Sequence, residues 1–220
     1  MTPLLNRILG PRIPEEDFKK RPFRYLLPNL LFTLAAVSLI ISVFFPFWRM
    51  DLKAPQYPRG LELIAYVDHI GGDVEELDLI NHYIGMRPLQ EAAKFEMSIA
   101  YYVMSVFALF LLAGTVIHTR WTAWLSLPAF LFPAAFILDM RWYMREFGMN
   151  LDPKAPLSSS VDPFVPTILG EGEVAQFTTL GYVDIGFWLA LGSSVLIIFA
   201  LWSHWAVWSP LVRKEEGKSN

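Results

Sequence analysis

Cysteine is absent from the 220-residue sequence. Its absence excludes disulfide bonds, iron–sulfur clusters, covalently attached haem and thiolate metal sites. Histidine is also scarce, with four residues in the whole chain. Any bound metal ion must therefore be held by a few imidazoles, by methionine thioethers, by carboxylates or by the backbone.

The sequence has little excess charge and lacks common enzyme motifs. A net charge of −3 favours neither nucleic acid nor a strongly charged partner. The chain has no nucleophile elbow, zinc-protease motif, phosphate-binding P-loop or dinucleotide-binding fingerprint. We therefore expect a protein that is not an enzyme and does not bind nucleic acid.

Apolar residues are abundant. They make up 54% of the chain, and the mean hydropathy is +0.38, more than a soluble domain of this size could bury. Four apolar runs are each long enough to cross a hydrocarbon core of roughly 30 Å. These runs cover residues 25–48, 97–117, 121–138 and 185–208. The sequence predicts an all-α membrane protein with four transmembrane helices.

The basic residues predict an orientation in the membrane. Residues 1–24 carry six of them, the 118–120 turn carries Arg120, and residues 209–220 carry three. Cytoplasmic flanks of transmembrane helices are enriched in Lys and Arg. We therefore expect a bacterial inner membrane protein with both termini in the cytoplasm. The tryptophans near the ends of the runs, Trp48 and Trp208 among them, are expected to form interfacial belts.

The first predicted outer loop, residues 49–96, has signals of a folded structure. Residues 61–68 are rich in strand-forming side chains, and Gly71 and Gly72 follow them. Leu77, Ile80 and Ile84 have helical spacing and predict a helix over 74–84. With the four spans, this loop gives a fold of four transmembrane helices with a small α/β extracytoplasmic cap.

Start and stop signals flank the predicted 74–84 helix. Asp73 and Glu76 have the spacing of a capping box at its start. Gly85 suits the left-handed residue after its end, where we expect Asn to be tolerated better than Val. Pro88 can begin a further helix that continues into the second span.

The second predicted outer loop, residues 139–184, begins as an amphipathic extension of the third span. Residues 139–145 are expected to lie as a helix at the membrane interface. A region rich in Pro and Ser follows, and residues 174–179 form a possible short strand. This strand is a candidate to pair with the strand of the first loop.

Soft side chains in the two outer loops suggest a copper site. His82 and Met86, joined by His69, Met140 and Met144, would offer imidazole and thioether ligands suited to Cu(I). Methionine is also an ordinary packing residue. Glu75 and Asp78 share a helix face with His82, so a solvated acidic stripe and a site for a hard divalent ion are alternatives.

A second pair of histidines lies at the other ends of the spans. His118 and His204 stand at or near the predicted inner ends. They could hold a b-type haem only if their rings faced each other across it. Ordinary interfacial histidines are the alternative.

Three segments of the first outer loop resemble a group of bacterial membrane proteins. They are residues 55–61, the Gly72–Asp73 pair and residues 79–88, and a weaker match covers 164–179. The group is associated with gene clusters for nitrous-oxide reductase maturation, where some members accompany copper-chaperone lipoproteins of the NosL type. The motif positions are Pro55, Tyr57, Pro58, Gly60, Asp73, Asn81, Tyr83 and Gly85.

The resemblance implies a periplasm-facing role in copper delivery or respiratory-enzyme assembly, with His82 and Met86 at the motif's chemically active positions. The chain lacks the Cys and the separate soluble domain of a complete chaperone. We therefore expect a membrane accessory protein for a copper-dependent respiratory enzyme, with other membrane or periplasmic proteins as partners. The alternatives are a non-catalytic structural subunit of a respiratory complex and a transport or quinol-binding protein, for which a cavity lined by Asp139 or Asp184 would argue.

Overall fold

The computed structural model describes residues 9–10, 13, 15–54, 56–157, 159–174 and 177–219. Pro55, one of the motif positions, lies outside them. The chain divides into two compact units. The helical unit comprises residues 1–41, 102–132 and 189–220, and the sheet unit comprises residues 42–101 and 133–188.

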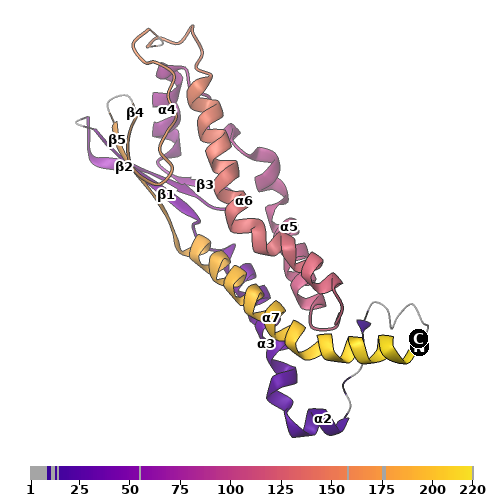
Figure 1. Ribbon diagram of the computed structural model, residues 1–220. Helices are drawn as coiled ribbons and strands as arrows, with labels where there is room; N and C mark the ends of the chain where they lie inside the picture. Colours follow the sequence, from indigo (N-terminus) through magenta and orange to yellow (C-terminus); the bar gives the residue numbers. More distant parts are fainter. Residues whose placement is uncertain are drawn as a thin grey trace. The chain divides into compact units, whose positions relative to one another are not determined.

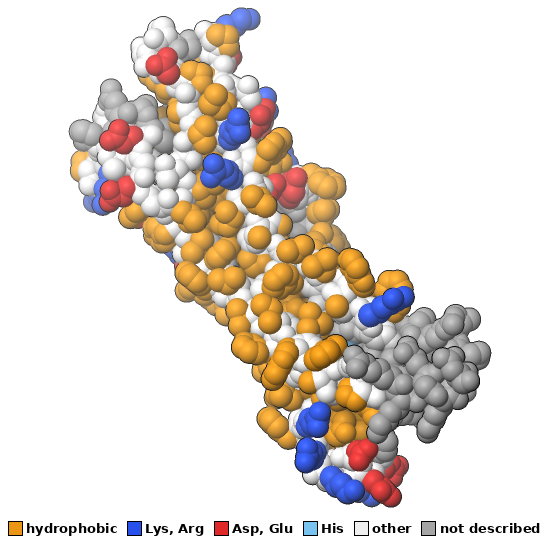
Figure 2. Space-filling model, in the orientation of Figure 1, with side chains coloured by type: hydrophobic (Ala, Val, Ile, Leu, Met, Phe, Trp, Pro, Cys, Tyr) orange, Lys and Arg blue, Asp and Glu red, His pale blue; other side chains and the backbone are white. Residues whose placement is uncertain are grey.

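Four helices are long and apolar enough to cross a membrane, as predicted. They are α3 (Pro22–Ser42), α5 (Lys94–Ala113), α6 (Trp121–Met149) and the Ile185–Leu211 part of α7 (Ile185–Ser219). On the face shown in Figure 2, hydrophobic side chains cover the long helices. Leu109 is 63% exposed and Phe199 is 55% exposed, an apolar surface that soluble proteins rarely present to water. A short helix, α2 (Glu15–Lys20), precedes α3.

The helix boundaries differ from the sequence prediction in three places. The first span does not extend to Trp48, because α3 ends at Ser42 and Trp48 begins a strand. The second helix runs over Lys94–Ala113 and not over 97–117. The expected helical extension of the third span is confirmed as the uninterrupted end of α6, which reaches Met149 and not only residue 145.

A five-stranded antiparallel sheet joins the two predicted outer loops (Figure 1). Its order is β3-β2-β1-β5-β4, so the first-loop strands pair with the second-loop strands through β1 and β5. The expected pairing between loops thus occurs, but through a strand that the sequence analysis missed. The strands are β1 (Trp48–Ala54), β2 (Tyr57–Ala65), β3 (Ile70–Gly72), β4 (Gly170–Val174) and β5 (Phe177–Val183).

Two strand predictions need correction. The strand expected at 61–68 is β2, which begins at Tyr57 and ends at Ala65. The single strand expected at 174–179 is part of a hairpin, in which β4 pairs antiparallel with β5. Ala175 and Gln176, between the two strands, are outside the described residues.

Trp48 belongs to the core of the sheet unit and not to an interfacial belt. It is fully buried, and its indole N–H donates to the Ile168 carbonyl at 2.7 Å. Met50 and Leu52 are buried on the same face of β1, because side chains two residues apart share a face of a strand. Leu63 of β2 extends this core.

Helix α4 (Val74–Ile84) closes the sheet unit, and its extent matches the prediction. It lies beside β2 and buries Leu77 and Ile84 (Figure 1). The predicted C-cap is confirmed, because Gly85 has φ 83°. The capping box is wrong, since the Asp73 carboxylate instead accepts a hydrogen bond from the Glu62 backbone N–H at 2.9 Å.

The helix expected after Pro88 is interrupted. Only the 3-10 turn η1 (Leu89–Glu91) forms, and Ala93 has a positive φ of 49° before α5 begins at Lys94. The Asp78 carboxylate fixes this turn by accepting a hydrogen bond from the Leu89 N–H at 2.6 Å. The chain therefore bends between α4 and α5.

The helical unit is joined by serine hydroxyls that reach across helix interfaces. Ser193 donates to the Ala35 carbonyl and Ser38 donates to the Leu189 carbonyl, both at 2.8 Å. Ser194 donates to the Phe130 carbonyl at 3.0 Å. Small hydroxyl residues allow close helix packing in apolar surroundings, where such bonds contribute about 1 kcal/mol each.

Candidate functional site

The structure does not bring His82 and Met86 to one open site. His82 is exposed on α4, and its ring contacts the neighbouring Tyr83 ring with centroids 6.0 Å apart. Met86 follows the helix end and is 8% exposed within the core of the sheet unit. The left-handed turn at Gly85 ends the helix between them, so the side chains of His82 and Met86 do not share a helix face.

His69 has partners of its own. Its Nδ1 lies 2.9 Å from an Asp68 oxygen, and its ring stacks on Tyr66 with centroids 4.2 Å apart. The Tyr101 hydroxyl donates to the other Asp68 oxygen at 2.7 Å. An imidazole in these contacts has a structural role at the turn before β3.

The segment from Asn81 to Met86 forms a junction between the two predicted outer loops. The buried Asn81 carbonyl accepts the Met86 N–H at 2.8 Å. The Gly85 carbonyl accepts the Asp152 N–H at 2.8 Å, and the Tyr83 carbonyl accepts the Leu157 N–H at 2.9 Å. The motif positions Tyr83 and Gly85 therefore connect the loops through the backbone, whereas Asn81 bonds within its own loop.

The alternative site for a hard divalent ion is not assembled. Asp78 is engaged with the Leu89 N–H, whereas Glu75 is exposed. Within the described part of the chain, no group of three or more His, Cys, Asp or Glu side chains could hold a metal ion. A divalent ion such as Ca²⁺ needs six to eight oxygen ligands, and the face of α4 does not supply them.

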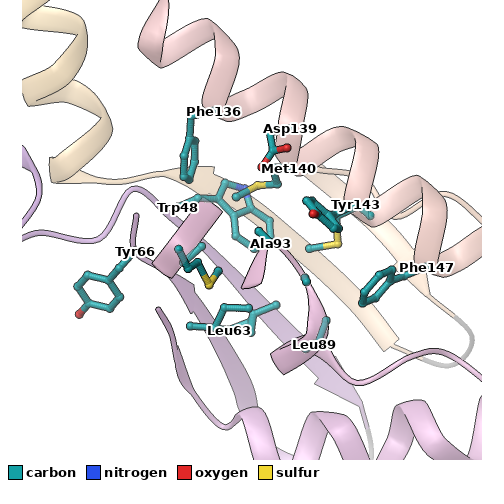
Figure 3. A pocket seen from close by; sticks show the side chains of 15 residues that line it. Trp48, Leu63, Tyr66, Leu89, Ala93, Phe136, Asp139, Met140, Tyr143 and Phe147 are labelled. Carbon is teal, nitrogen blue, oxygen red and sulfur yellow. The ribbon is translucent and has the colours of Figure 1, made fainter. Parts of the chain in front are cut away.

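A cavity of about 80 Å³ lies within the sheet unit (Figure 3). Its walls come from β1, β2, β3, the segment before α5, the start of α5 and one face of α6. The α6 residues recur at helical spacing, since residues three or four positions apart lie on one face. The lining includes Trp48, Met97, Phe136, Asp139, Met140, Tyr143 and Met144.

Three methionines line this cavity, Met97, Met140 and Met144. Two of them were predicted ligands, whereas Met97 was missed because it was assigned to the second span. Its position at the start of that span, on the same predicted side as Met140, is the sequence signal that could have found it. The structure thus brings Met140 and Met144 together with Met97, and not with His82.

Polar groups are few around the cavity. Asp139 is its one carboxylate, next to Met140 on α6 (Figure 3). The Tyr143 hydroxyl donates to a Glu96 carboxylate oxygen at 3.3 Å. Thioethers with one nearby carboxylate can bind a soft, singly charged cation, because thioether sulfur prefers Cu(I) and the carboxylate offsets its charge.

The cavity is too small for a quinol ring. An engineered cavity of about 150 Å³ is of the size that takes benzene, and the cavity here has about half that volume. A cavity lined by Asp139 was the feature expected of a transport or quinol-binding protein. Its volume instead favours an ion or a few water molecules.

Asp184 belongs to an ion-pair network and does not line the cavity. The Arg49 guanidinium of β1 donates to Asp184 and, at 2.7 Å, to Glu62 of β2. Hydrogen bonding to Asp184 and then to Glu62 raises the pKa of Arg49. Asp184 also caps α7 by accepting the Ile185 N–H at 2.6 Å. Sequence reasoning missed this network because its members lie far apart along the chain.

The two histidines of the helical unit do lie close together. The His118 and His204 ring centroids are 5.7 Å apart, and both rings stack on Trp208, at 4.1 Å and 4.8 Å. Trp208 is 2% exposed, so it is not an interfacial belt residue. A haem held between the two rings would pass through the indole that covers both of them, so the b-type haem considered as an alternative does not fit.

No protein-family model and no curated protein matches the sequence.

Proposed function

We propose that the chain is a membrane accessory protein, not an enzyme, that handles Cu(I) for a copper-dependent respiratory enzyme. The observation that carries this proposal is the cavity lined by Met97, Met140 and Met144. Thioethers are soft ligands that select Cu(I) over hard divalent ions. The resemblance of the Asn81–Met86 segment to proteins of nitrous-oxide reductase maturation supports the choice of partner.

The chemistry of the cavity suits transient binding. Thioether ligands are neutral, so a bound Cu(I) keeps its charge, and Asp139 is the one lining group that offsets it. A partner site that offers thiolate or imidazole ligands would bind the ion more tightly. The chain would then pass the ion on and not retain it, as an accessory protein requires.

The exposed face of α4 is the proposed contact with the partner. Leu79 is 64% exposed and Tyr83 is 53% exposed, with His82 between them on the same helix. Tyrosine is a typical anchor of protein interfaces. The backbone of this segment is fixed to the second loop at Tyr83 and Gly85, so this face is preorganised.

A structural subunit of a respiratory complex is the second candidate. The burial of Met86 favours it, because the residue that the resemblance made a possible ligand is a packing residue. In that case α4 would dock permanently against another subunit and the chain would carry no copper.

Competitive Cu(I) titration of the purified protein separates the two candidates. We expect stoichiometric binding with a sulfur shell at about 2.3 Å in X-ray absorption, a typical metal–sulfur distance. The triple Met97→Leu, Met140→Leu, Met144→Leu variant should lose this shell, with copper affinity at the cavity reduced at least tenfold. Leucine nearly conserves methionine's volume, so the fold should survive.

Two controls locate the site. Met149→Leu changes an exposed methionine of the same helix and should leave the sulfur shell intact. His82→Ala and Met86→Leu should also retain it. If the triple variant binds Cu(I) with an unchanged sulfur shell, or if the wild type shows none, the copper proposal is wrong and the structural-subunit alternative is the better one.

A further inference from the structure

Three buried ring nitrogens meet in the helical unit without a hydrogen-bond partner. In the described part of the chain, His118 Nδ1, His204 Nε2 and Trp208 Nε1 are all buried and unpaired. His204 is 6% exposed and Trp208 is 2% exposed. A buried polar group without a partner is destabilising, so two such imidazoles in neighbouring rings require an explanation.

The two imidazoles lie on one face of the Trp208 indole. Their planes are tilted from it by 17° and 19°, so both stack on it. The centroids of the His118 and His204 rings lie 4.1 Å and 4.8 Å from that of Trp208. If the two histidine rings lay on opposite faces of the indole, the distance between them would be nearly the sum of these values. Their centroids are only 5.7 Å apart. The histidine rings therefore lie edge to edge above the indole.

His204 has a ring nitrogen that could face a metal ion. Its Nε2 is buried without a hydrogen-bond partner, and it offers a lone pair when the ring proton is on Nδ1. A metal-bound histidine commonly donates its second ring N–H to a backbone carbonyl, which fixes its tautomer and leaves the other nitrogen for the ion.

The rings that surround the two imidazoles are aromatic and carry no charge. The other aromatic ring in contact with His204 is that of Phe32, whose centroid lies 6.3 Å away. A neutral imidazole can offer a nitrogen lone pair to a metal ion.

We propose that His118 and His204 together bind one soft, singly charged metal ion against the indole face of Trp208. Cu(I) and its redox-inert analogue Ag(I) belong to this class. A metal ion bonded at about 2 Å to each of two imidazole nitrogens fits rings whose centroids are 5.7 Å apart. An indole face within about 6 Å attracts a cation, and Trp is the best side chain for this interaction.

The same geometry disfavours Zn²⁺. Zinc takes four ligands in structural sites and three protein ligands in catalytic ones, whereas this cluster offers two imidazoles. A buried doubly charged ion also needs carboxylate or thiolate compensation, which the rings of this cluster do not provide. The Trp208 N–H is a donor only, so it contributes its face and not its nitrogen.

This site does not depend on the proposed function, because its residues belong to the helical unit and the methionine cavity belongs to the sheet unit. The two sites also differ in ligand atom. X-ray absorption therefore reports on each site separately, because a sulfur shell lies farther from the metal ion than a nitrogen shell does.

The test is Ag(I) titration of the full-length protein in detergent, followed by tryptophan fluorescence and X-ray absorption. We expect a nitrogen shell in the wild type and in the triple methionine variant. His118→Gln and His204→Gln should each lower the affinity of the nitrogen site at least tenfold. Trp208→Phe should weaken it less, because both nitrogen ligands remain.

A measurement on the wild-type protein tests the proposal even if the histidine variants fail to fold. Ag(I) should protect His118 from diethylpyrocarbonate, whereas the exposed His69 and His82 should react equally with and without Ag(I). The proposal is wrong if wild-type protein shows no nitrogen shell, if His118 reacts equally in both conditions, or if Zn²⁺ displaces Ag(I) at equal concentration.

Discussion

At the scale of single residues, Gly85 satisfies two separate requirements. Its φ of 83° lies in the left-handed region that favours glycine. A Cβ atom on Gly85 would also lie 2.6 Å from the Asp152 carbonyl oxygen and 2.8 Å from the Asp152 nitrogen. The first requirement could be predicted from the sequence, as a helix-end signal. The second could not, because it depends on where the second loop passes, and it removes the expected tolerance of Asn.

We predict that Gly85→Ala and Gly85→Asn both destabilise the protein by about 3 kcal/mol or more. The substituted residue would have a strained φ, and the backbone of Asp152 would also have to move away from its Cβ atom. Gly170→Asn is the matched control, since Gly170 has φ 89° with nothing within 4 Å of its Cβ position. It should cost about 1 kcal/mol. Thermal unfolding in detergent measures the stability of the Gly85 and Gly170 variants. An equal loss of stability at the two positions would show that the close approach of Asp152 to Gly85 has no effect.

His118 gives a pH dependence whose sign follows from its pKa. The imidazole titrates near 6.5 in the unfolded chain, but near 4 in the folded protein. Between these values the unfolded state binds more protons, so stability should fall as pH decreases from 6.5 towards 4. His118→Gln should flatten this part of the curve of melting temperature against pH. An unchanged slope in the variant would assign the dependence to other groups.

At the scale of elements, the sequence predicted correctly the features that depend on neighbouring residues. It did not predict those that depend on residues far apart along the chain. Helix α4 and its C-cap follow from helical spacing and a glycine within eleven residues. Strand β1 was missed because its first residue ends an apolar run, and its partners in β5 lie more than a hundred residues away. The Asp73 carboxylate likewise bonds β2 and not its own helix.

The methionine cavity shows the same division. Met140 and Met144 could be grouped from the sequence, because they lie four residues apart on one helix. The absence of His82 from the cavity lining could not be predicted, because it depends on how the sheet, α6 and the start of α5 surround one cavity. Met97 lines the cavity for the same reason.

Arg49 connects three elements, so its removal should lower the stability of the sheet unit. It joins β1 to Glu62 of β2 and to Asp184 at the start of α7. Arg49→Met should leave the Asp184 carboxylate, 15% exposed, without its cation and cost about 1–3 kcal/mol. Arg59→Met, at an exposed position of β2, should have little effect. Equal unfolding free energies for the two variants would show that the network contributes nothing.

At the scale of the whole molecule, the central topological prediction is that both termini face the cytoplasm. The chain has no cysteine, so single cysteines report position cleanly. Glu75→Cys on α4 and Ser159→Cys in the second loop are exposed sites that avoid strained glycines. An impermeant thiol reagent should label both in intact spheroplasts, and Arg120→Cys only after lysis. The reverse pattern would overturn the orientation.

The most direct test of the functional account is the copper content of the partner enzyme in cells. In the native host, deletion of this chain should leave a copper-dependent respiratory enzyme present but depleted of copper. The wild-type gene and the Met149→Leu variant should restore its copper, and the triple Met97, Met140 and Met144 to Leu variant should not. Full copper loading in the deletion strain, or complete rescue by the triple variant, would contradict a role of this protein in copper handling.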